Sequence, residues 1–155
     1  MVYRQFLRSA ERHLQICKQL LKDVDALEDS TKKANVLSEI YYLSGYVLEA
    51  GLSYAFFSHI RYSGDIYLSE HYQNNGFKTH NISLKYSYLL KNSCIINDLV
   101  FVSAKHSNRE LQSLFNGWDV KYRYEQYVKI KKRTIDAYIV EVERGLNKIR
   151  TQYPF

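Results

Sequence analysis

One carboxylate stands in the most apolar part of the sequence. The stretch Tyr41–Phe57, "YYLSGYVLEAGLSYAFF", carries a single charged residue, Glu49, near its centre. A membrane-spanning helix needs about 20 mainly apolar residues, and this stretch is shorter, charged and rich in Tyr and Ser, so we expect a helix enclosed by other protein. A buried carboxylate is costly unless a partner neutralises it. We therefore expect a cation from another part of the chain to contact Glu49.

Familiar catalytic signatures do not occur in the sequence. It has no glycine-rich phosphate loop, no HExxH, no GxSxG and no calcium-binding loop. The five histidines do not show metal-ligand spacing on one helix face, so we expect no metal site and no cofactor. They are His13, His59, His71, His80 and His106.

The last part of the chain carries most of the net positive charge. The net charge is +6, and from Lys121 onward nine basic residues stand against four acidic ones. Such a stripe attracts phosphates or an acidic partner, and aromatic rings among cations can stack on bases. The alternatives are a solvated helix face and tyrosines that pack at a helix or dimer interface. The basic and aromatic residues concerned include Lys121, Tyr122, Arg123, Tyr124, Tyr127, Lys129, Lys131, Lys132 and Arg133.

The spacing of apolar residues predicts two long helices at the start of the chain. Steps of three and four indicate one helix from Tyr3 to Val24. A second begins near Ser30 or Thr31, either of which can cap it, and continues to about Ile60. Two glycines inside its apolar stretch, at positions 45 and 51, cost roughly 1 kcal/mol each relative to alanine. We therefore expect another backbone to approach this helix closely.

The rest of the chain predicts a polar loop and further helices. Residues 63–80 lack a sustained period and are expected to form a loop with one helical turn. Shorter helices are predicted over 81–93, with Ile82, Tyr86, Leu89 and Leu90 inward, and over 94–104 and 108–115. Segment 94–104 is rich in β-branched residues, but no second strand can pair with it. A last helix is expected from about Glu125 to Arg150, which gives an all-α fold in a single domain over 1–155.

Composition indicates a folded protein of the cytoplasm. The sequence is 46% apolar and 25% charged, and its only proline is Pro154, so nothing before it forbids long helices. Cys17 and Cys94 lie among apolar neighbours and are expected to be core thiols in a reducing compartment. The first residues lack the apolar region of a signal peptide. We expect no association with a membrane.

Three blocks of the sequence resemble the HEPN domain superfamily (higher eukaryotes and prokaryotes nucleotide-binding). The central helix is similar to its Ala-Gly-Tyr-x-x-Glu core, the segment before residue 82 to its Thr-His-Asp-Leu segment, and a late block to its Trp-x-x-x-x-Arg-Tyr pattern. The matching residues are Ser44, Gly45, Tyr46 and Glu49, then Thr79 and His80, with Asn81 and Ile82 in place of Asp and Leu, then Trp118, Arg123 and Tyr124.

The resemblance implies an up-and-down bundle of four to five helices that forms a homodimer. Members of the superfamily act as ribonucleases, as toxins paired with nucleotidyltransferase antitoxins, or as non-catalytic binders of RNA or nucleotides. Their nuclease motif, Arg followed after four to six residues by His on a late helix, is absent. The literal match of Arg8 with His13 lies in the first helix and is treated as chance. Ser53 also stands where many members have Lys, so we expect a non-catalytic binder in a toxin, defence or mobile-element system.

The expected binding residues combine the resemblance with the basic stripe. They are Glu49, His80, Arg123, Tyr124, Lys131, Lys132 and Arg133, with no catalytic or metal-ligating residue among them. We expect Arg123 to be the cation that pairs with Glu49, with His80 as second candidate, although His80 can alternatively cap the following helix. Two other functions remain open. One is a divergent ribonuclease in which Arg123 stabilises phosphate charge while His80 or His71 transfers a proton, and the other is a helical module that binds an acidic protein.

Overall fold

The described part of the structure is all-helical. The structure, a computed structural model, describes residues 1–97, 99, 108–124 and 128–154, and within these ranges it contains no strand. This confirms the all-α, up-and-down helical bundle. The α-helices are α1 (Arg4–Asp23), α2 (Ser30–His59), α3 (Glu70–Gln73), α4 (Ile82–Lys91), α5 (Arg109–Gly117) and α6 (Lys132–Gln152). The described residues thus form six α-helices, more than the four to five expected, because α3 and α5 are short additional helices. Short 3₁₀ turns are η1 (Val24–Ala26), η2 (Ile66–Leu68) and η4 (Val120–Arg123).

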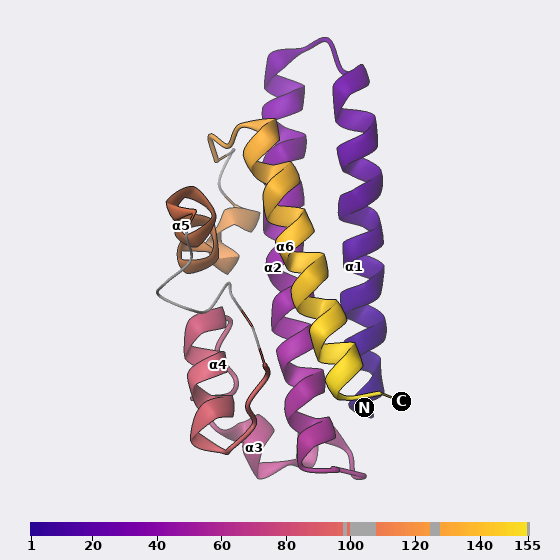
Figure 1. Cartoon of the computed structure of the whole chain (residues 1–155), viewed down its shortest axis with the longest axis vertical. Coiled ribbons are helices and arrows are strands. Elements are labelled where there is room, and N and C mark those ends of the chain that lie inside the picture. The colour runs from indigo at the N-terminus through magenta and orange to yellow at the C-terminus, as the bar shows by residue number, and fades with distance from the viewer. Residues whose placement is uncertain (98, 100–107, 125–127, 155) are drawn as a thin grey trace.

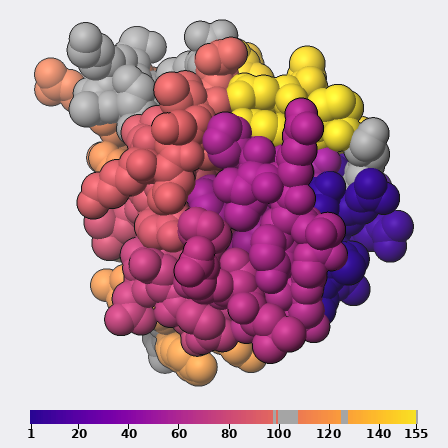
Figure 2. All heavy atoms as spheres, turned by 90° about the horizontal axis from the view of Figure 1, so that it is seen from below, coloured from indigo at the N-terminus to yellow at the C-terminus, as the bar shows by residue number. Residues whose placement is uncertain are grey.

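Helix α2 lies at the centre of the bundle. It packs against α1, which runs antiparallel to it, and against α6, while α4, α5 and η4 lie along another side (Figure 1). The segment that follows α2 closes the lower end of the bundle, with α4 beside it (Figure 2). Both long helices predicted at the start of the chain are confirmed. The cap of α2 is different, because the Asp29 carboxylate accepts a hydrogen bond from Lys32 N at 2.8 Å, and neither Ser30 nor Thr31 is the cap.

Two helix predictions in the second half of the chain are wrong in part. The last helix begins at Lys132, because the Ser38 hydroxyl of α2 binds both the N–H and the C=O of Val128 and keeps residues 128–131 out of the helix. Residues 125–127 lie outside the described ranges. In the segment predicted to be helical over 94–104, residues 94–97 and 99 are not helical, and the others lie outside the described part of the chain. The loop over 63–80 contains one turn of helix, α3, as expected.

Both cysteines lie in the core as free thiols. Cys17 and Cys94 are buried, which confirms the prediction of core thiols. The Cys17 thiol lies 3.6 Å from the backbone oxygen of Ile40, across the contact between α1 and α2. None of the described helices is both long and apolar enough to cross a membrane.

The core contains weak acids that stay neutral in the folded state. Burial raises the pKa of Cys17 from 9.0 to about 12, and it also raises the pKa of Tyr41 and Tyr138 above their ordinary value of 10.0. Between the ordinary and the raised pKa the unfolded chain has lost the proton while the native chain retains it, so stability falls as pH rises.

We therefore expect the free energy of unfolding, measured by urea denaturation, to fall from about pH 9 upward and more steeply once tyrosines ionise in the unfolded chain. Cys17→Ala should make the first part of this slope shallower, by up to about 1.4 kcal/mol per pH unit. The difference between the two slopes gives the contribution of the Cys17 thiol, because all other titrating groups are the same in both proteins. Equal slopes would contradict the prediction.

Candidate binding site around Tyr46

Glu49 is sheltered and contacts two basic side chains. Its side chain is 16% exposed, His80 Nδ1 lies 3.0 Å from Oε2, and Lys85 Nζ lies 3.5 Å from Oε1. The expected neutralisation of this carboxylate is confirmed, and the second candidate, His80, is one of the partners. The first candidate was wrong, since Arg123 forms no ion pair with Glu49 within the described residues. Arg123 lies in η4 instead, where it acts electrostatically on Tyr46.

Lys85 is the functional candidate that the sequence interpretation missed. Leu90 was expected to point inward but is exposed, whereas Lys85 is only 3% exposed. The ammonium donates to Ser53 Oγ at 3.1 Å and lies 4.5 Å from the centre of the Phe77 ring. Burial lowers the pKa of Lys85, and the carboxylate beside it opposes this change. The signal was available, because Lys85 follows Ile82 by three residues and precedes Leu89 by four, which places it on the buried stripe of α4.

Ser53 connects the two ends of this contact. The Lys85 ammonium reaches the Ser53 hydroxyl from α4. Ser53 Oγ itself donates to the backbone oxygen of Glu49 at 2.9 Å. Glu49, Ser53 and Lys85 thus form one polar cluster between α2 and α4.

His80 holds the carboxylate and does not cap α4. The cap is Asn81, whose side-chain oxygen accepts a hydrogen bond from Leu84 N at 2.9 Å. Thr79 supports this turn, since its hydroxyl accepts from Asn81 N at 3.0 Å. The His80 side chain is consequently directed to Glu49 while part of its ring remains exposed to solvent.

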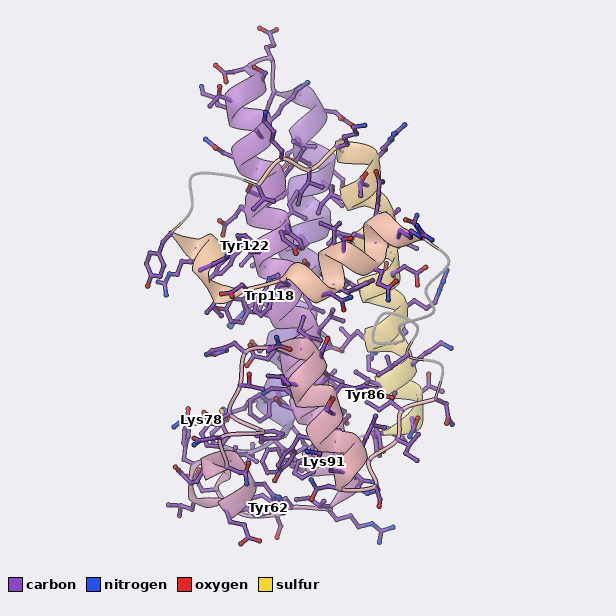
Figure 3. All side chains as sticks on the ribbon, turned by 90° about the vertical axis from the view of Figure 1, so that its left-hand side faces the viewer. Tyr62, Lys78, Tyr86, Lys91, Trp118 and Tyr122 are labelled. Carbon is purple, nitrogen blue, oxygen red and sulfur yellow. The ribbon has the colours of Figure 1, made fainter. Side chains whose placement is uncertain are left out.

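Trp118 packs on α2 where a glycine leaves room for it. A Cβ at Gly45 would lie 1.7 Å from Trp118 Cε2, so only glycine permits this contact. The buried indole donates from Nε1 to the Tyr42 backbone oxygen at 3.0 Å, and Figure 3 shows it against α2 just beyond α4. The expected close approach at this glycine is real, but the approaching group is a side chain. At Gly51 the neighbours are likewise side chains, those of Leu146 and Ile149.

Tyr46 lies at the meeting point of the three blocks. Its ring packs edge-on against Trp118, with centroids 5.3 Å apart, and against His80, at 6.5 Å. On the side of α1 it contacts His13, at 6.0 Å, and its hydroxyl lies 3.0 Å from that of Tyr42. Burial and the Tyr42 hydrogen bond raise the pKa of Tyr46, so the hydroxyl is neutral.

A cleft opens beside this cluster, between the start of α4 and η4. Its volume is about 220 Å³, and it is lined by Thr79, His80, Asn81, Trp118, Asp119 and Val120. Arg123 and Tyr124 follow directly in the chain, with the guanidinium carbon 5.9 Å from the Tyr124 ring centre. Tyr124 is 83% exposed. The cleft itself offers the His80 imidazole, and the Arg123 guanidinium and the exposed Tyr124 ring belong to residues that follow its last lining residue, Val120, in the chain.

The three expected cations at the start of α6 and just before it do not line this cleft. Lys131 lines a separate groove of about 260 Å³ between α5 and the start of α6. Lys132 is paired with Asp136 at 2.8 Å and with Asp25 at 3.5 Å, and these carboxylates raise its pKa. Arg133 is exposed. Two later cations of α6 are also paired, Arg144 with Glu141 and Arg150 with Glu11.

Other candidate residues lie elsewhere. His71 packs on Phe56, with ring centroids 5.0 Å apart, and its Nδ1 lies 2.9 Å from the Tyr88 hydroxyl. His106 and Tyr127 are outside the described ranges. The described residues contain no group of three or more His, Cys, Asp or Glu side chains placed to hold a metal ion.

Comparison of the chain with protein-family models, with curated proteins and with solved structures gives no significant match. Function is therefore inferred from the side chains around Tyr46 and from the three blocks that supply them.

Proposed function

We propose that this chain is a HEPN-like protein of the cytoplasm that binds RNA or a nucleotide at the cleft between α4 and η4 without cleaving it. One observation carries the proposal. The three HEPN-like blocks are far apart in sequence, yet Tyr46, His80 and Trp118, one from each block, are in ring contact. The resemblance further suggests a homodimer, a nucleotidyltransferase as partner protein, and a place in a toxin, defence or mobile-element system.

The side chains around the cleft suit a phosphorylated ligand with an exposed base. Arg123 presents a guanidinium fork that matches phosphate oxygens. The Glu49 carboxylate occupies Nδ1 of His80, which leaves Nε2 for a ligand. Tyr124 offers an exposed ring on which a base can stack.

We expect single-stranded RNA to bind the wild-type protein in a filter assay, with an affinity that falls steeply between about 50 and about 200 mM salt. Arg123→Ala should weaken binding about tenfold and lower the salt slope by about one, because one phosphate contact is lost. Lys91→Ala is the matched control, since it removes an equal charge toward the far end of α4 (Figure 3). Equal affinities of the two variants would contradict the proposal, and an affinity independent of salt would favour the protein-binding module.

A divergent ribonuclease is a second candidate, which the contact between Glu49 and His80 favours. A carboxylate that orients an exposed imidazole is a common arrangement for proton transfer. In this case labelled RNA should be cut by the wild-type protein and remain intact with His80→Ala. Intact RNA with the wild-type protein removes this candidate and leaves the binding proposal in place.

A further inference from the structure

A second groove lies between α1 and η2, away from the cleft described above. Its volume is about 550 Å³, within the range of small-molecule sites. It is lined by Met1, Gln5, Arg8, Ser9, Arg12 and Tyr67. These side chains supply two guanidinium groups, an aromatic ring and several polar groups, and they include no carboxylate. Figure 2 shows the first residues of the chain, in indigo, next to the segment that follows α2.

The two arginines lie one turn apart on α1 and form no ion pair with any residue that the structure describes. Like charges at this spacing destabilise a helix. Within the described residues neither Arg8 nor Arg12 has an ion-pair partner, whereas Lys18 on the same helix is paired with Glu143. Glu11, the carboxylate nearest to Arg8 along the helix, contacts Arg150 of α6 at 3.4 Å. The Glu11 carboxylate is thus engaged with α6, and the two guanidinium groups remain at the groove.

Tyr67 forms the facing edge of the groove and is held in place. The residue is 51% exposed, and its ring packs edge-on against Tyr72 with centroids 5.3 Å apart. Its backbone is fixed at both ends, because its N–H donates to Asp65 and its oxygen accepts from Gln73 Nε2 at 2.7 Å. An exposed aromatic ring with a fixed backbone is a suitable stacking surface for a planar ligand.

We infer that this groove binds a nucleoside polyphosphate, independently of the cleft near Tyr46. The guanidinium groups of Arg8 and Arg12, separated by about 6 Å of helix rise, bind successive phosphates through paired hydrogen bonds. The base stacks on Tyr67. Gln5 and Ser9 line the same groove and supply polar groups for the sugar.

Calorimetric titration with ATP and with inorganic tripolyphosphate at low salt tests the inference. Wild-type protein should bind ATP about tenfold more tightly than tripolyphosphate, because only ATP has a base to stack. Tyr67→Leu should remove this difference. The double variant Arg8→Ala/Arg12→Ala should bind both ligands at least about a hundredfold more weakly, at about tenfold per arginine. Arg8→Lys/Arg12→Lys should lie between the two, since it keeps the charge and loses the fork.

Lys22→Ala is the matched control, because it removes a cation from the exposed last turn of the same helix. All substituted side chains are exposed, and circular dichroism verifies that the variants fold. Two results would overturn the inference: unchanged ATP binding in the double alanine variant, or equal binding of ATP and tripolyphosphate by the wild-type protein. The same titrations are repeated in the Arg123→Ala background, where nucleotide binding at the proposed cleft is weakened. ATP binding at the groove should be unchanged there, so failure here is distinguishable from failure of the proposed cleft.

Discussion

Gly45→Ala is expected to lower the free energy of unfolding by about 3 kcal/mol or more. In an exposed helix the same change would gain roughly 1 kcal/mol from helix propensity. Here the new Cβ would lie 1.7 Å from Trp118 Cε2 and 2.1 Å from Nε1, so the indole has to leave its site. Its hydrogen bond to the Tyr42 oxygen and much of its buried contact would be lost with it. Overpacking and the lost hydrogen bond together exceed the gain from propensity.

Urea denaturation of three further variants separates this cause from others. Gly117→Ala is the matched control, because its Cβ would meet only the Tyr41 hydroxyl at 3.8 Å, an ordinary contact. Trp118→Ala should be strongly destabilising in the wild-type background and cost little more once Gly45→Ala is present, since the indole is already displaced. A Gly45→Ala protein within about 1 kcal/mol of wild type would show that Trp118 does not depend on this glycine.

Glu49→Gln is expected to cost roughly 3–5 kcal/mol of stability. The substitution keeps the shape of the side chain but leaves the Lys85 ammonium buried without its carboxylate, and breaking one partner of a buried ion pair has about this effect. Lys85→Met should cost less, because Glu49 keeps His80 as a partner. In the double variant neither charge is left unpaired, so its loss should be smaller than the sum of the two single losses.

The pH dependence provides an independent readout of the same pair. The pKa of Lys85 is already lowered by burial, and loss of the carboxylate removes the group that opposes this change. Between the lowered pKa and the ordinary value of 10.5, the unfolded chain binds the proton that the native chain releases, so this lysine makes stability rise with pH. The loss of stability of Glu49→Gln relative to wild type should therefore be smaller near pH 10 than near pH 7. Additive single losses together with parallel pH profiles would rule out the coupling.

The local order of the chain could be predicted from the sequence to a large extent. Apolar steps of three and four give the bounds of α1 and α2 to within a residue or two, because each helix buries one continuous stripe. The need for a partner at Glu49 was equally clear, since a carboxylate inside an apolar helix cannot remain unpaired. One correct partner, His80, was among the two candidates that the sequence offered.

The pairings across the fold were decided by tertiary structure alone. Lys85 was overlooked because a lysine on a buried stripe is acceptable only when Glu49 and Ser53 of another helix stand opposite it. The late start of α6 follows from Ser38, whose hydroxyl binds the Val128 backbone across 90 residues of sequence. Periodicity records which face of a helix is buried, whereas the partner of each buried polar group depends on how the helices are placed against one another, and no local pattern contains that information.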